Sequence, residues 1–183
     1  MNATIPSDPG AARPNAAAWS ADPAAWRFLL VRYAPTLAVL NLAWELMQLP
    51  LYALWHEALP RTIAYAVLHC TAGDVLIGML ALLTALVATR AGAYRRWHWQ
   101  RIGVITVVLG IAYTAFSEWR NALLLGHWTY TPAMPVLPLV PIGVAPLLQW
   151  TLVPPAALGL ARRRAEPAVG PAAPHVNDNG EQS

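Results

Sequence analysis

Lysine is absent from this chain of 183 residues, and cysteine occurs once, at Cys70. Without lysine the chain cannot form a Schiff base with retinal or with an aldol substrate. A single cysteine excludes an intrachain disulfide, a CxxC redox pair and a metal site of several thiolates. Charge is also scarce, because 11% of the residues are charged, against roughly a quarter in soluble domains. We therefore expect an integral membrane protein.

Hydrophobic residues make up 57% of the chain and gather in four long runs. A transmembrane helix needs about 20 mostly apolar residues to cross roughly 30 Å of hydrocarbon. The four runs that meet this requirement are about 33–55, 62–88, 102–124 and 136–160. Prolines in the first and the fourth run predict kinks there. The expected fold class is all-α: a polytopic membrane protein with four transmembrane helices in one bundle, covering residues 28–163.

The basic residues are all arginine, and they are distributed unevenly between the runs. Arginines flank the start of the first run, fill the connection between the second and third, and follow the fourth, whereas the connection "GHWTYTPAMP" has none. The positive-inside rule then places both termini in the cytoplasm and the protein in the inner (plasma) membrane as a multi-pass protein. The arginines thus indicate topology, and we expect no nucleic-acid partner. Residues 1–27 and 164–183, rich in Ala, Pro and polar residues, are expected to be a flexible arm and a disordered tail.

Two acidic residues lie at matching depth in the first two runs. Glu45 is about 12 residues into the outward run and Asp74 about 12 residues into the returning run, so each lies roughly 18 Å from its starting boundary. Both are therefore expected near the middle of the membrane. His69 and Glu118 are expected nearer the outer side, and Gln149 near the middle of the fourth run.

Polar side chains recur on single helical faces of the first and third runs. Residues spaced i, i+4, i+7 share a face, and two such sets are Asn41, Glu45, Gln48 and Thr114, Glu118, Asn121. We therefore expect a polar cleft in the middle and outer half of the bundle. The segment "LLLGHWTYTP" is expected to cover it.

Acidic residues inside a membrane are costly, at about 2.5 to 3.5 kcal/mol for one at a helix centre, so a functional role is the default interpretation. The candidate catalytic residues are Glu45, His69, Asp74 and Glu118. The candidate substrate-binding residues are Asn41, Trp44, Gln48, Asn121, Trp128, Tyr130 and Gln149. The alternative is structural: the acids are neutral or hydrogen-bonded groups that join helices, with Glu118 answered by Arg120.

Acid chemistry is the function that this pattern favours. Two acids at one depth in a medium of low dielectric constant cannot easily both ionise, and a buried neutral carboxylic acid can donate a proton to a carbon–carbon double bond. We expect Glu45 and Glu118 to act as the donor and the cation-stabilising base, tuned by His69 and Asp74. Gln48 and Asn121 would orient the acids. The hypothesis is an isomerase or cyclase that acts on an isoprenoid-like or other lipid olefin without a cofactor.

Other functions stay open at this point. Glu45, His69, Asp74 and Glu118 could hold a divalent metal, although no Glu-x-x-His motif supports di-iron chemistry. A haem with two histidine ligands is disfavoured, because His69 is the only histidine expected to be well buried. The chain could instead be a non-catalytic lipid-binding or accessory subunit with a membrane partner. A small transporter is the third alternative, and it would require a homo-oligomer to enclose a pathway.

Two partial resemblances to known families also bear on function. "WELMQLPLYALW" followed by "TIAYAVLHCTAGDVLIGML" resembles, over about residues 41–88, the two-helix core of emopamil-binding/sigma-2-type (EXPERA) membrane domains. This likeness rests on Glu45, Gln48, Pro50 and His69.

"EWRNALLLGHWTYTP" and "APLLQWTLVPP" resemble, over about residues 110–156, the second half of small bacterial lycopene cyclase-type domains. Leu148 and Gln149 stand where that family has paired glutamates. Both resemblances imply a helical membrane domain that handles sterol or isoprenoid olefins, with proton-initiated isomerisation or cyclisation in members of each.

Overall fold

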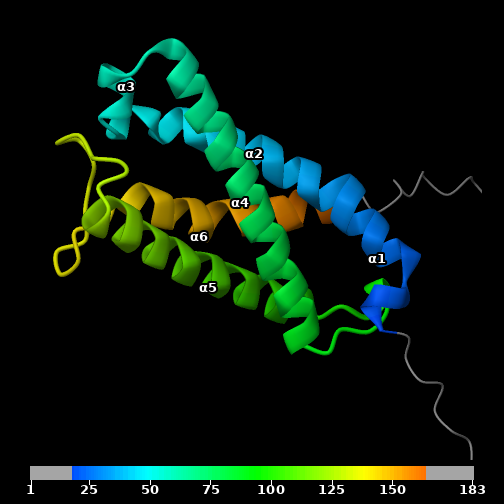
Figure 1. The fold of residues 1–183 in the computed structure, drawn as a ribbon. Coiled ribbons are helices and arrows are strands. Elements are labelled where there is room, and N and C mark those ends of the chain that lie inside the picture. Colours follow the sequence, from blue (N-terminus) through cyan, green and yellow to red (C-terminus); the bar gives the residue numbers. More distant parts are fainter. Residues whose placement is uncertain (1–17, 164–183) are drawn as a thin grey trace, which may run out of the picture.

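The computed structural model describes residues 18–163, and they fold into helices without a β-strand (Figure 1). Three helices are long and apolar enough to cross a membrane. They are α4 (Pro60–Ala88), α5 (Trp99–Glu118) with its continuation as the π-helical turns η5 (Trp119–Leu124), and α6 (Val144–Arg163). The expectations of a helical fold and of membrane-spanning helices are confirmed at this level.

The first predicted run belongs to a long helical segment that starts earlier and ends earlier than expected. Helix α1 (Pro23–Arg27), the π-helical η2 (Phe28–Tyr33) and α2 (Ala34–Gln48) follow one another without a gap. Asp22 caps this segment by accepting a hydrogen bond from the Ala24 amide at 2.9 Å.

Pro50 ends this first segment, where the sequence predicted a kink and a helix as far as residue 55. Proline lacks an amide hydrogen and crowds the preceding turn, so the chain tightens into the 3₁₀ turn η3 (Leu49–Leu51) and becomes extended at Tyr52. A single helical turn, α3 (Leu54–Glu57), then leads into α4.

The helix of the fourth predicted run, α6, starts later than predicted, at Val144 instead of about residue 136. Pro138 and Pro141 lie before it in an irregular connection, whereas Pro154 and Pro155 lie inside the helix. The prediction of the start was wrong because apolar residues between closely spaced prolines resemble a helix in hydropathy alone.

Helices α2, α4, α5 and α6 form a four-helix bundle. Helix α2 packs against α4 and α6, and α5 packs against the same two neighbours. Figure 1 shows α3 and the connection between α5 and α6 together at one end of the bundle, and α1 with the α4–α5 connection at the other. We call these the α3 end and the α1 end.

Aromatic rings hold the α1 end together. The Phe28 ring lies 5.2 Å, centroid to centroid, from both Tyr94 and Trp99, and 5.8 Å from Trp97. The Arg162 guanidinium lies 4.6 Å from the centroid of the Trp99 ring, so the end of α6 joins the same cluster. Residues 18–27 of the predicted arm pack here through the buried Ala25 and the Trp19 ring. Residues 1–17 of that arm, and the predicted tail 164–183, lie outside the described residues.

Helices α5 and α6 approach closely at Gly110. A Cβ atom built on Gly110 would lie 2.0 Å from Cε3 of Trp150, whereas one on Gly103 of the same helix would lie 3.7 Å from Leu158 Cδ1. The first distance is a severe clash with a ring that is itself buried, and the second is ordinary contact. Gly110 is therefore a packing requirement of the bundle.

We predict that Gly110→Ala destabilises the protein by about 1 to 3 kcal/mol, because Trp150 must leave its position. Gly103→Ala is the matched control. It should be neutral or stabilise by about 0.5 to 1 kcal/mol, since alanine is the better helix former. Unfolding in detergent, followed by circular dichroism, measures both. Equal midpoints for the two variants would contradict the proposed packing.

Candidate functional site

A cleft of about 810 Å³ lies between α2, α4, α5 and α6 at the α3 end of the bundle. Polar side chains from all four helices line it, together with aromatic rings and the connection between α5 and α6. The polar and ionisable lining residues include Glu45, Gln48, Glu57, His69, Cys70, Asp74, Ser117, Glu118, Asn121, His127 and Gln149. No arginine is among its lining residues.

The Gln149 side chain connects three helices at the inner wall of the cleft. Its amide nitrogen, Nε2, lies 2.8 Å from Asp74 Oδ2 on α4, 2.9 Å from Asn41 Oδ1 and 3.4 Å from Glu45 Oε1, both on α2. Gln149 is only 2% exposed. One buried amide thus serves the two predicted midplane acids at once.

A second amide reinforces this network from α2. Gln48 Nε2 donates to Glu45 Oε1 at 2.9 Å and lies 3.3 Å from Gln149 Oε1, while Gln48 Oε1 accepts from Trp44 Nε1 at 3.1 Å. The spacing of i+3 between Glu45 and Gln48 puts both on one helical face, as the sequence predicted. Trp44 therefore holds the Gln48 amide in the orientation that donates to Glu45.

Glu45 and Asp74 share the Gln149 amide as a donor, which brings their carboxyl groups to neighbouring positions across the α2–α4 interface. Two ionised carboxylates at one donor repel each other, which favours a form in which the pair holds a proton. The matching depth inferred from the sequence corresponds here to a shared hydrogen-bond donor.

Glu118 has a different environment, although it lines the same cleft. Its Oε2 atom accepts hydrogen bonds from the Tyr130 hydroxyl and, at 3.4 Å, from Trp128 Nε1. The Tyr130 hydroxyl in turn accepts from the Gly143 amide at 3.1 Å. No ion pair joins Glu118 to Arg120 in the part of the chain that the structure describes. Glu118 therefore binds the α5–α6 connection.

The same connection is fixed to the end of α2 by backbone pairing. Tyr52 and Tyr130 form an isolated antiparallel bridge, flanked by the bonds Ala53 N to Thr129 O at 3.0 Å and Thr131 N to Leu51 O at 2.9 Å. Burial raises the pKa of both Tyr52 and Tyr130, and the hydrogen bond to Glu118 adds to the rise at Tyr130. The segment that was predicted to cover the cleft is thus hydrogen-bonded to the chain that follows α2, at the α3 end of the bundle.

His69 and Asn121 occupy the cleft without contacting the acids. His69 is exposed, not well buried as the sequence suggested, and its ring stacks at 5.6 Å on Tyr65. Asn121 donates to Ser117 O at 2.9 Å, and its Oδ1 lies 3.2 Å from His127 Nδ1. Asn121 therefore positions the start of the connection and not a carboxyl group.

The structure brings the predicted site residues together around one cleft, with three exceptions. Eight of the eleven line it: Glu45, His69, Asp74, Glu118, Gln48, Asn121, Trp128 and Gln149. Asn41, Trp44 and Tyr130 do not line the cleft, and each instead forms a hydrogen bond with a lining residue.

The metal alternative finds no donor set here. Among residues 18–163, no group of three or more His, Cys, Asp or Glu side chains is placed to hold a metal ion. Glu45 and Asp74 form a pair, and Glu118 is engaged with the α5–α6 connection.

Sequence reasoning missed the aromatic lining of the cleft, which includes Tyr52, Tyr65, Tyr113 and Trp150. One signal was available, since Tyr65 and His69 are an i, i+4 pair and therefore lie on one face of the predicted helix. Tyr52 had no such signal, because it enters the cleft only where the helix ends at Pro50.

We predict that Gln149→Leu destabilises the protein by about 1 to 3 kcal/mol, since Asn41, Glu45 and Asp74 lose a buried donor. Thr151→Val on the same helix is the control. Its hydroxyl bonds only to the Leu147 carbonyl, so it should change stability by less than about 0.5 kcal/mol. Unfolding titrations in mixed micelles compare the two, and an unchanged Gln149→Leu midpoint would contradict the assigned role.

We predict that Tyr130→Phe frees the α5–α6 connection and speeds hydrogen exchange of the Gly143 amide by about tenfold, because that amide loses its acceptor. Tyr113→Phe is the control, as its hydroxyl has no hydrogen bond among the described residues. Exchange at neutral pH followed by mass spectrometry measures this. Similar exchange of Gly143 in both variants would count against the assigned contact.

The raised pKa of Tyr130 also sets the direction of its pH dependence. Above about pH 10, the ordinary value for tyrosine, the unfolded chain releases this proton before the folded chain does, so stability falls as pH rises. The wild-type unfolding midpoint should therefore fall more steeply between about pH 9 and 11 than that of Tyr130→Phe.

Comparison with known proteins gave no match for this chain, whether with family models, with curated proteins or with solved structures.

Proposed function

We propose that this chain is a membrane enzyme that isomerises or cyclises an isoprenoid-like lipid olefin by proton transfer in the cleft. The observation that carries the proposal is the placement of the Glu45 and Asp74 carboxyl groups around one buried amide donor at the cleft wall. A protonated carboxyl group beside an open cavity is a donor that a hydrocarbon double bond can reach.

The proposed topology has four spans, with Pro23–Gln48 as the first. That continuous helical segment of 26 residues is roughly 39 Å long, which is enough to cross the hydrocarbon region. The arginines of the α4–α5 connection and of the end of α6 support a cytoplasmic α1 end by the positive-inside rule. The cleft then opens in the outer half of the inner membrane, where a lipid substrate enters between helices.

The proposed reaction begins with transfer of the proton shared by Glu45 and Asp74 to one carbon of the double bond. The π electrons form the new C–H bond and leave a carbocation on the other carbon. Isomerisation ends when a neighbouring carbon loses a proton to a carboxylate and its C–H electrons form the shifted double bond. In a cyclisation, a second double bond attacks the cation before that proton is lost. One proton enters and one leaves, so no external oxidant or reductant is required.

Glu118 and the aromatic rings are suited to stabilise the cation. The Glu118 Oε1 atom has no hydrogen-bond partner among the described residues, whereas Oε2 is occupied by Tyr130 and Trp128. Rings of Tyr65, Tyr113 and Trp150 line the cleft, and the faces of such rings attract cations. Glu118 is thus assigned the role of base and cation stabiliser.

A second candidate function is binding of a lipid without chemistry. The observation that favours it is that protein donors already bind one oxygen of each acid, because Gln48 and Gln149 bond Glu45 while Tyr130 and Trp128 bond Glu118. A network of this kind also serves to join helices in a membrane.

The proposed enzyme predicts uptake of solvent deuterium into its lipid substrate. Purified protein in nanodiscs, made with lipids extracted from the cells of origin, is incubated in D₂O, and the lipids are analysed by mass spectrometry. The wild type should add deuterium to a carbon-bound position of one lipid class. Glu45→Gln should lower that rate by 10²-fold or more, since it removes an acid catalyst.

Glu57→Gln is the matched control, because Glu57 also lines the cleft but is exposed, and its side chain has no hydrogen bond among the described residues. It should label lipid at the wild-type rate. If the wild type labels no lipid but retains one that Glu45→Gln loses, the binding function is correct instead. If the wild type neither labels nor retains a lipid, both proposals fail.

A further inference from the structure

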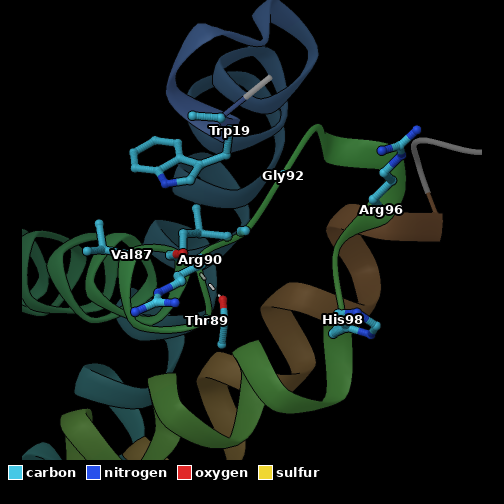
Figure 2. Close-up of a pocket in the computed structure, with 10 residues that line it drawn as sticks. Trp19, Val87, Thr89, Arg90, Gly92, Arg96 and His98 are labelled. Atoms are coloured by element: carbon cyan, nitrogen blue, oxygen red, sulfur yellow. Dashed lines mark hydrogen bonds between the residues drawn. The ribbon is translucent and has the colours of Figure 1, made fainter. Parts of the chain in front are cut away.

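The cleft differs in kind from a smaller cavity, of about 560 Å³, at the α1 end of the bundle. The lining of the smaller cavity includes Arg90 and Arg96, and Figure 2 shows their side chains extending away from each other. No acidic residue lines it. Of these two cavities, only the cleft combines acidic groups with a long wall formed by one helix.

The cleft follows one face of α4. Its lining on this helix extends from Thr62 to Ile77, and most of the lining residues recur at intervals of three or four positions, so they share a helical face. These two residues are 15 positions apart, which corresponds to roughly 22 Å along the helix axis. The cleft is therefore elongated. Asp74 lies one turn from Ile77, close to the end of the cleft that is nearer α1.

The cleft opens sideways, between α4 and α5. Tyr65 on α4 and Tyr113 on α5 both line it, and these side chains are 67% and 49% exposed. Figure 1 shows α4 and α5 close together at the α1 end and apart toward the α3 end. Tyr113 lies 14 residues after the start of α5, or roughly 21 Å along a helix long and apolar enough to span a membrane. In a membrane, this opening faces lipid.

Gly73 lies in the middle of the α4 face that lines the cleft. Cys70, one turn before it, and Ile77, one turn after it, line the cleft as well. A Cβ atom built on Gly73 meets no heavy atom within 4 Å beyond its own helical backbone and chain neighbours, in contrast to the clash at Gly110. Glycine destabilises a helix interior relative to alanine, and no protein contact requires it here. The missing side chain widens the cleft beside Asp74.

Hydrogen-bonding groups line the cleft at the α3 end. They include Glu57 of α3, Thr62 at the start of α4, and His127 of the α5–α6 connection. Thr62 and Gly73 are 11 positions apart, or roughly 16 Å along α4. A lipid whose polar end group binds at the α3 end therefore needs a long extended chain to reach Gly73 and the acids.

We propose that the cleft binds a long isoprenoid-like chain along α4, with the polar end group of the lipid at the α3 end and its chain over Gly73. This rests on the proposed function for the class of ligand, and it concerns binding alone. Gly73 is then a specificity-determining residue, because a larger side chain takes up space that the chain needs. The part of the lipid beside Glu45 and Asp74 is remote from its polar end group, so the double bond that reacts lies toward the apolar end.

The test compares two probes on the full-length protein in detergent micelles. They are geranylgeraniol and geraniol, which has half its chain, and native mass spectrometry measures their retention. We expect Gly73→Leu to weaken retention of geranylgeraniol by about tenfold or more, because the side chain enters the space of the ligand. Geraniol is too short to reach Gly73 from the α3 end, so it should bind more weakly, and to the wild type and the variant alike. Gly73→Leu should unfold at the wild-type temperature or a higher one, since leucine is the better helix former.

Gly159→Leu on α6 is the matched control, because a Cβ atom on Gly159 also meets nothing within 4 Å, yet Gly159 does not line the cleft. It should retain both probes as the wild type does. The inference is overturned if the wild type binds neither probe, if Gly73→Leu keeps geranylgeraniol, or if Gly159→Leu loses it equally. Equal weakening of geraniol by Gly73→Leu overturns the orientation. A wild type that retains geranylgeraniol but labels no lipid in D₂O refutes the proposed reaction and leaves this inference in place.

Discussion

The buried amide of Gln149 is the interaction on which the cleft depends. A carboxyl group in an apolar bundle is costly unless a donor accompanies it, and Gln149 provides donors to Asp74 and Glu45 from a third helix. The acids can therefore sit at the α2–α4 interface only while α6 holds its place and rotation. Helix packing and the cleft are linked here, because Gln149 both joins the helices and lowers the cost of burying Glu45 and Asp74.

Three of the four acids that line the cleft divide into two groups because their partners differ. Glu45 and Asp74 both accept hydrogen bonds from side-chain amides at the cleft wall. Glu118 is bonded through Oε2 to two groups of the α5–α6 connection. The connection cannot lift without breaking those bonds, so opening of the cleft at the α3 end changes the surroundings of Glu118 first. Movement of the connection and the surroundings of Glu118 are thereby linked.

Much of this arrangement followed from spacing and depth in the sequence. The i, i+4, i+7 sets identified the inward faces of α2 and α5, and equal depth brought Glu45 and Asp74 together. What the sequence could not provide was the direction of bonds between helices. Trp44 and Tyr130 were predicted to line the cleft. Instead, each donates a hydrogen bond to a residue that lines it, Trp44 to Gln48 and Tyr130 to Glu118. The start of α6 was predicted wrongly for another reason. Hydropathy alone does not show that Pro138 and Pro141 interrupt a helix.

Gly110 explains how α6 maintains the rotation that the amide requires. Trp150 follows Gln149 directly, and its ring fills the space that a side chain at Gly110 would occupy. Neighbouring residues on a helix point about 100° apart, so a tryptophan locked against α5 fixes the direction of the glutamine toward α2 and α4. A rotation of α6 that moved the amide away from the acids would drive the indole out of this space. The absence of a side chain on α5 thus determines in which direction the Gln149 donor points from α6.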